Sequence, residues 1–176
     1  HIGIKAVQLL NALGYEVLMP AHGESGRTWL SKGLVRKAKT IANQNIALFS
    51  PLISDATPLI GIEPSAILTF RDEYPDLATD QNLHAAKTLA SNAFLIDEFI
   101  AREINQGRIS KDQFNTNKRA ILLHGHCQQK AVGSLADSIK ILSFPENHTV
   151  ETIPSGCCGM AGSFGYEKEH YDVSMK

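Results

Sequence analysis

The sequence predicts an α/β fold in which a parallel sheet carries helices on both faces and is built from two pseudo-repeat halves. Two observations predict it. Short apolar stretches with the composition of buried strands alternate with segments of helical periodicity. Residues 15–20 also resemble residues 149–154, because each stretch ends in proline and precedes a glycine-rich turn and a helical pattern. Such folds bind ligands at the C-terminal edge of the sheet, so we expect the site there.

The first half, residues 1–106, has Rossmann-like alternation of helices and strands. Its boundaries follow from glycines and prolines, since Gly14 ends one helical pattern, Pro20 ends a strand, and Pro64 and Pro75 bracket a short helix. Helices are expected at 4–13, 28–49, 65–73 and 83–105, and strands at 15–19 and 58–62.

The stretch 107–118 is polar and is predicted to be a linker. The second half, residues 119–176, repeats the alternation. Strands are expected at 119–123 and 149–153, and helices at 128–141 and 162–175.

All three cysteines lie in this second half. Cys157 and Cys158 are adjacent and stand among glycines, whereas Cys127 follows His126 where a predicted strand has ended. Thiolates bind soft metals, and glycines let the backbone approach a bulky ligand closely. The pattern therefore favours an iron–sulfur cluster or zinc held by the three cysteines.

Three other interpretations of the cysteines stay open. A disulfide between Cys127 and one member of the pair would leave one cysteine over. Buried structural cysteines are common in proteins. A redox pair is the third alternative, although Cys157 and Cys158 would form a strained disulfide and do not make a C-x-x-C motif.

Three thiolates are one ligand short of the usual four. His124 and His126 flank Cys127, and we favour His126 as the fourth ligand. His148 and His170 are expected to be surface residues.

A nucleotide site is a rival hypothesis from another class. Gly159, Gly162 and Gly165 follow a predicted strand and could cradle a phosphate. Their spacing is not G-x-G-x-x-G, and two cysteines stand at the start of the loop, which weighs against it.

Charge and composition limit the partners. The chain has 176 residues, 43% of them hydrophobic, which suits one sizeable core. Its net charge is −1, and basic and acidic residues are interspersed along the chain. The sequence therefore predicts no basic surface for nucleic acid. No apolar segment is long enough to cross a bilayer, so no transmembrane segment is expected. We expect the protein to be in the cytoplasm. Peripheral attachment to the inner face of the membrane is the alternative.

Other charged residues have simple interpretations. Glu63, Arg71 and Glu73 are interpreted as caps or helix-surface charges. Arg27 is interpreted as holding an anion or pairing with Glu24.

Several stretches resemble the cysteine-rich CCG domain family, which includes the heterodisulfide reductase catalytic subunit and the glycolate oxidase iron–sulfur subunit. The closest form is the C-terminal domain of FAD-linked 2-hydroxyacid dehydrogenases. The resemblance covers nearly the whole chain. The stretches are SGRTWLSKGLVRKAKTIANQNIALF at 25–49, GIEPSAILTFRDEYPDL at 61–77, LLHGHCQQKAVG at 122–133 and IPSGCCGMAGSFGYE at 153–167.

The resemblance implies a domain of a glycolate- or D-lactate-type oxidoreductase. In it Cys127, Cys157 and Cys158, with His126, would hold an iron–sulfur cluster. The cluster would relay electrons between an FAD on another domain or subunit and an unknown acceptor. The chain by itself is not expected to have the complete activity.

Two departures from the family pattern change these expectations. Glu24 and Ser25 stand where the family has its first cysteine pair, and Ala66 stands where a further cysteine is common, so the first site is expected to be lost. The family's last ligand falls beyond Lys176, so the second half is expected to be truncated and the isolated chain to be metal-free or to bind zinc. A zinc-binding or metal-free structural or docking module is the alternative function.

Overall fold

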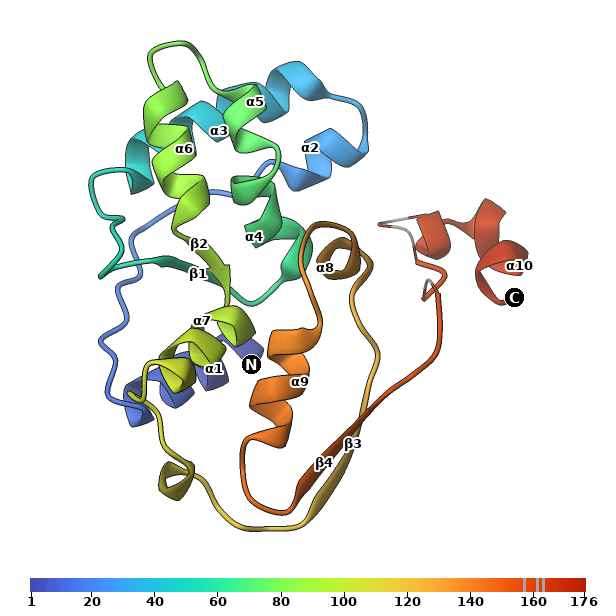
Figure 1. Cartoon of the computed structure of the whole chain (residues 1–176). Helices are drawn as coiled ribbons and strands as arrows, with labels where there is room; N and C mark the ends of the chain where they lie inside the picture. The colour runs from blue at the N-terminus through green and yellow to red at the C-terminus, as the bar shows by residue number, and fades with distance from the viewer. Residues whose placement is uncertain (157, 161, 163) are drawn as a thin grey trace.

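The computed structural model describes residues 1–156, 158–160, 162 and 164–176, and it has the predicted α/β class (Figure 1). Its strands pair in parallel, β1 (Leu59–Gly61) with β2 (Ala93–Leu95) and β3 (Arg119–Leu123) with β4 (His148–Thr152). Within the described residues these pairs form two separate sheets, whereas the sequence predicted a single one. Helices connect the two strands of each pair, so each pair is the core of a βαβ unit.

Helices make up most of the first half. Two predicted long helices are each interrupted. The helix expected at 28–49 breaks at Gly33, whose φ of 72° is left-handed. The helix expected at 83–105 contains strand β2. The helices are α1 (Ile2–Ala12), α2 (Arg27–Ser31), α3 (Val35–Phe49), α4 (Pro64–Arg71), α5 (Tyr74–Leu77), α6 (Leu83–Ser91) and α7 (Ile96–Asn105).

The strand predicted at 15–19 is wrong, because these residues form no strand. Tyr15 and Val17 instead pack on a buried apolar cluster. An extended segment becomes a strand only by pairing its backbone with a neighbour. The prediction of a strand at 149–153 is confirmed, because residues 148–152 pair with β3.

The second half contains shorter helices than the sequence predicts. The helix expected at 128–141 is interrupted at Gly133, and the one expected at 162–175 is a series of short turns. The expected linker holds one 3₁₀ turn. These elements are η1 (Lys111–Gln113), α8 (Cys127–Val132), α9 (Ala136–Ser143), η2 (Phe164–Tyr166), η3 (Lys168–His170) and α10 (Tyr171–Ser174).

Two apolar clusters form the core. The larger lies among α3, α4, α5, α6 and β2 and includes Ile46, Leu68 and Leu89, each at most 1% exposed. The smaller joins α1 and α7 and also takes Ile141 and Phe144 from the second half. The second half is thus packed on the first through shared apolar surface.

Polar contacts reinforce this seam between the halves. Buried Gln129 on α8 donates from Nε2 to Asp97 Oδ2 on α7 over 2.9 Å and to Ser138 Oγ on α9 over 2.8 Å. Ser138 also donates to Asp97. Because buried polar groups need partners, this network fixes α8 against the body of the molecule.

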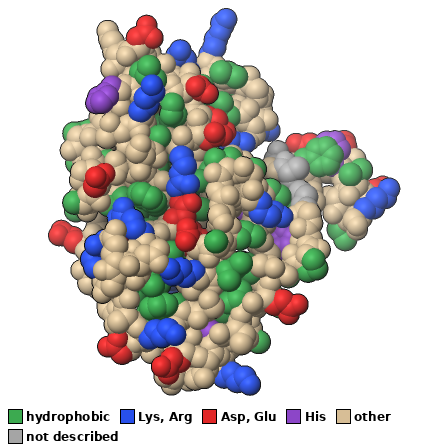
Figure 2. All heavy atoms as spheres, in the orientation of Figure 1, with side chains coloured by type: hydrophobic (Ala, Val, Ile, Leu, Met, Phe, Trp, Pro, Cys, Tyr) green, Lys and Arg blue, Asp and Glu red, His purple; other side chains and the backbone are tan. Residues whose placement is uncertain are grey.

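The C-terminal segment packs mainly on itself, beyond the end of β4 (Figure 1). The rings of Phe164 and His170 stack with centroids 3.7 Å apart, and Gly165 donates its N–H to Met160 O over 2.9 Å. Figure 2 shows this segment projecting from the main body. Across the described residues, no helix has both the length and the apolar character needed to cross a bilayer.

Candidate metal centre

The two cysteine-bearing segments start at the same edge of one sheet. Leu123, the last residue of β3, is in register with Thr152, the last residue of β4, and the strands are parallel. Ile153 continues the contact by donating its N–H to Leu123 O over 2.9 Å. The chain toward Cys127 and the chain toward Cys158 therefore both leave from the C-terminal edge of this sheet.

A tight turn carries the chain from β3 into α8. Gly125 is buried, and a Cβ there would overlap Leu135 Cδ1 and lie 2.7 Å from its Cδ2. Only glycine fits this close approach without a shift of Leu135. The turn delivers Cys127 to the first position of α8, where it is a free and exposed thiol.

His126 caps α8 through its side chain. Its Nδ1 accepts the N–H of Gln128 over 3.2 Å, so in the neutral ring the hydrogen is on Nε2. Nε2 faces Glu63 Oε1 at 3.8 Å. A metal bond through Nε2 would move the ring hydrogen to Nδ1 and remove the cap. Ligation by His126 stays a prediction.

Cys158 is the second described cysteine, and it too is free and exposed. The loop before it is bound by Lys130 of α8, whose Nζ donates to Gly156 O over 2.8 Å and to Ser155 O over 3.4 Å. Cys157 lies outside the described residues. Lys130 thus joins the helix that starts at Cys127 to the loop that leads to Cys158.

His148 and His170 each have a local partner. His148 Nδ1 is 3.2 Å from Leu142 O, and His170 Nδ1 is 3.0 Å from Glu167 Oε2. Among the residues that the structure describes, no three His, Cys, Asp or Glu side chains are grouped closely enough to hold a metal ion. The chemistry of the donors still fits a soft metal, because both described cysteines are free thiols on segments that start from one sheet edge.

Hydrogen bonds hold the corresponding loop of the first half. Asn45 Nδ2 donates to Glu24 O and to the Tyr74 hydroxyl, each over 2.8 Å, and that hydroxyl donates to Ser25 O over 2.9 Å. Arg27 pairs with Glu73, not with Glu24. Asn45 and Tyr74 could not be identified from the sequence, because no local pattern marks an inward amide or hydroxyl as the partner of a distant loop.

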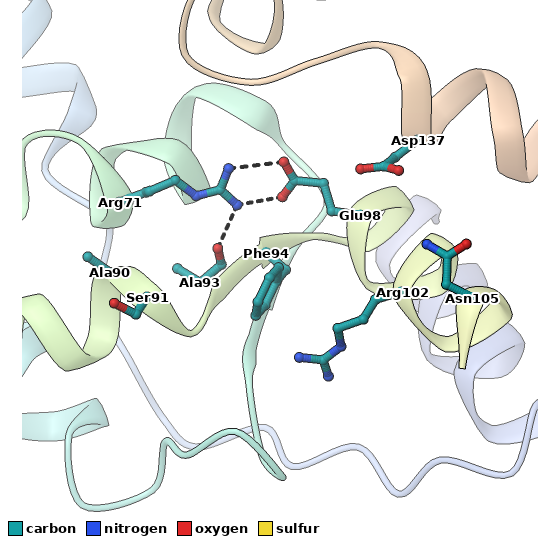
Figure 3. A pocket seen from close by; sticks show the side chains of 9 residues that line it. All are labelled: Arg71, Ala90, Ser91, Ala93, Phe94, Glu98, Arg102, Asn105 and Asp137. Atoms are coloured by element: carbon teal, nitrogen blue, oxygen red, sulfur yellow. Dashed lines mark hydrogen bonds and ion pairs between the residues drawn. The ribbon is translucent and has the colours of Figure 1, made fainter. Parts of the chain in front are cut away.

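A cleft of about 610 Å³ opens between α6, α7 and α9 (Figure 3). Arg71 crosses it and donates to both carboxylate oxygens of Glu98, over 3.0 and 2.5 Å, and to Ala93 O over 2.7 Å. Arg71 therefore ties α4 to α7 and is not the surface charge that the sequence suggested. Burial, with the charges of Glu98 and Asp97, raises the pKa of Asp137 at the far wall.

Arg102 also points toward this cleft, with its guanidinium 4.9 Å from the centre of the Phe94 ring. Its Nε donates to buried Glu103 over 3.1 Å. The cleft is lined by ion pairs and apolar side chains without cysteine, so it is separate from the candidate metal centre.

The chain is similar in sequence to parts of larger dehydrogenases. It is 24% identical over 170 residues to D-2-hydroxyglutarate dehydrogenase of Pantoea ananatis (strain AJ13355), covering 96% of this chain and 16% of that protein. It is 23% identical over 177 residues to one subunit of the anaerobic glycerol-3-phosphate dehydrogenase of Escherichia coli (strain K12), covering 99% of this chain and 43% of that protein. No family model and no solved structure matches.

The matched relatives are thus much longer than this chain, which spans about a sixth of one and less than half of the other. Both relatives are named as dehydrogenases or parts of one, so the similarity supports an oxidoreductase context.

Proposed function

We propose that the chain is the cysteine-rich electron-relay domain of a larger flavin-linked 2-hydroxyacid oxidoreductase of the CCG type. Cys127, Cys157 and Cys158 would hold an iron–sulfur centre. The observation that carries the proposal is the register of Leu123 with Thr152, which starts both cysteine-bearing segments at one sheet edge. The similarity to parts of two larger dehydrogenases supports the same conclusion.

The chain's own residues would bind the cluster, and the cluster would supply one-electron chemistry when bound. Cys127 and Cys158 are exposed free thiols, so iron and sulfide can reach them during reconstitution. The fourth position would go to His126, at the expense of its helix cap, or to an external ligand. Another domain or subunit would bind FAD and oxidise the hydroxyacid. We place the whole enzyme in the cytoplasm.

A flavin-reduction experiment tests the relay. The protein is reconstituted with iron and sulfide without oxygen and is then mixed with photochemically reduced FAD. We expect visible cluster absorbance that bleaches on mixing and returns after an oxidant is added. Cys158→Ser should show neither absorbance nor bleaching. A protein that stays colourless, or absorbance that reduced FAD leaves unchanged, would contradict the relay.

Histidine variants test the fourth ligand in the same preparation. His126→Ala should retain less iron than the parent, and His84→Ala, an exposed histidine on α6, should retain as much. Equal iron in all three proteins would exclude His126 as a ligand.

A zinc-binding or metal-free docking module is the second candidate. The first-half loop favours it, because side chains of the protein itself, Asn45 and Tyr74, bind the backbone carbonyls of that loop. Zinc without iron or sulfide after the same reconstitution would support a structural site. Absence of any metal would support a docking module.

A further inference from the structure

Lys130 connects the two cysteine-bearing segments. Its Nζ lies 2.8 Å from Gly156 O and 3.4 Å from Ser155 O, and these carbonyls come directly before the cysteine pair. An ammonium group has three N–H donors, so it can bind both carbonyls at once. A basic side chain in the last turn of a helix commonly binds that helix's own last carbonyls, whereas Lys130 binds the neighbouring loop.

The helix that carries Lys130 is itself held in place. Gln129, the preceding residue, is only 6% exposed and donates to Asp97 and Ser138 on the body of the molecule. Neighbouring residues of a helix point in different directions, so Gln129 anchors α8 inward while Lys130 is free to extend outward. The loop is therefore attached to a fixed support.

The loop needs such a support because β4 ends well before the cysteines. After Ile153 bonds to Leu123, the next backbone bond is local, from Ser155 N–H to Ile153 O over 2.8 Å. The segment after Gly159 then packs largely on itself. Lys130 binds the stretch between Ile153 and Cys158, at the carbonyls of Ser155 and Gly156.

We propose that Lys130 is a positioning residue that clamps the backbone at 155–156 onto α8 and so holds Cys158 beside Cys127. The inference deepens the proposed function, because it assigns the device that brings the thiol ligands together. It also holds for the thiols without metal, so it can be tested apart from cluster binding.

The test uses cross-linking of two thiols. Cys157→Ser leaves Cys127 and Cys158 as the only thiols of the chain. Dibromobimane becomes strongly fluorescent when it joins two nearby thiols, and its rate of cross-linking reports their proximity. In this test the Cys157→Ser protein is the parent. We compare it with the same protein that also carries Lys130→Met, Lys130→Arg or Lys87→Met, where Lys87 is an exposed lysine on α6.

We expect the parent to cross-link and Lys130→Met to slow the reaction about fivefold, as loss of the exposed contact of this ammonium group with the two carbonyls predicts. Lys130→Arg should retain most of the rate, and Lys87→Met should retain all of it. Alkylation of each thiol by iodoacetamide should be unchanged in every variant, which shows that the reactivity of the single thiols is not what changes the cross-linking rate.

Two results would overturn the clamp. One is a parent that does not cross-link, and the other is a folded Lys130→Met protein that cross-links as fast as the parent. Circular dichroism establishes folding, and Lys130→Gln replaces Lys130→Met if the latter is unfolded. If cross-linking depends on Lys130 but no iron binds on reconstitution, the clamp stands and the proposed relay fails.

Discussion

Glu63 and His126 face each other across the seam between the two halves, with 3.8 Å between Glu63 Oε1 and His126 Nε2. Each residue caps the helix that follows the first strand of its βαβ unit. The pair thus marks equivalent positions of the two units. The structure aligns β1 with β3 in this way, whereas the sequence comparison aligned residues 15–20 with β4.

Removal of the first cap should weaken α4. Glu63 accepts the N–H groups of Ser65 and Ala66 over 3.1 and 2.6 Å. We expect Glu63→Ala to lower the free energy of unfolding by about 1 kcal/mol, measured by urea denaturation. Glu146→Ala, at an exposed acid, should change it much less. Equal effects of the two substitutions would show that the cap contributes nothing.

Two glycines should differ in how well they tolerate alanine. A Cβ at Gly61 would overlap the Cβ of Ile67, a β-branched residue only 4% exposed, and would lie 2.8 Å from its Cγ1. A Cβ at Gly125 would meet the end of the Leu135 side chain, which can rotate away. We expect Gly61→Ala to cost about 3 kcal/mol of unfolding free energy and Gly125→Ala about 1 kcal/mol.

Gly23→Ala is the control for this pair, because a Cβ there would meet no atom within 4 Å. Urea denaturation of the three variants measures the order. A cost of Gly125→Ala at or above that of Gly61→Ala would contradict the packing argument.

Glu103 should make stability depend on pH. Its carboxylate is 2% exposed, and the hydrogen bond from Arg108, with those from Tyr15 and Arg102, lowers its pKa from 4.5 to about 2 despite burial. Because the folded pKa is below the unfolded one, this stabilisation is complete above about pH 4.5 and is lost as pH falls toward 2.

We therefore expect Glu103→Gln to cost about 2 kcal/mol at pH 7 and progressively less between pH 4.5 and 2, by urea denaturation at several pH values. Glu16→Gln, an exposed acid, serves as the control. If Glu103→Gln destabilised the fold equally at pH 7 and pH 2.5, the ionised carboxylate of Glu103 would not be the form that stabilises the folded state.

Tyr74 should hold the first-half loop. Its side chain is fully buried, burial raises its pKa to about 12, and its hydroxyl donates to Ser25 O. Tyr74→Phe leaves that carbonyl and the Asn45 amide each short of a partner, so we expect a loss of about 1 kcal/mol. Faster amide exchange around residue 25 should accompany it. Tyr166→Phe, at an 81% exposed residue, should alter neither quantity.

The sequence predicted strands β1, β3 and β4. Residues 59–61, 119–123 and 148–152 are all strands within a residue or two of the expected bounds. Strand β2 was missed because Ala93, Phe94 and Leu95 continue the helical periodicity of 83–105, and they become a strand only by pairing with β1. Gly33 and Gly133 interrupt helices whose apolar periodicity runs through them.

Part of the candidate site was also predictable from the sequence. Cys127 and Cys158 are visible in sequence, and parallel pairing of β3 with β4 brings their segments to one edge. The contact of Lys130 with the carbonyls of 155 and 156 joins residues about 25 positions apart, and no local pattern predicts it. The position of Cys157 lies outside the described residues.

Iron, zinc and sulfide content, with an absorption spectrum, tests the central claim most directly. The protein is purified and reconstituted without oxygen, with a small thiol present as an external fourth ligand. Iron and sulfide that bind to the parent and are absent from Cys157→Ser would establish the cysteine-held cluster that we predict. Iron bound equally by both proteins, or absent from both, would contradict it.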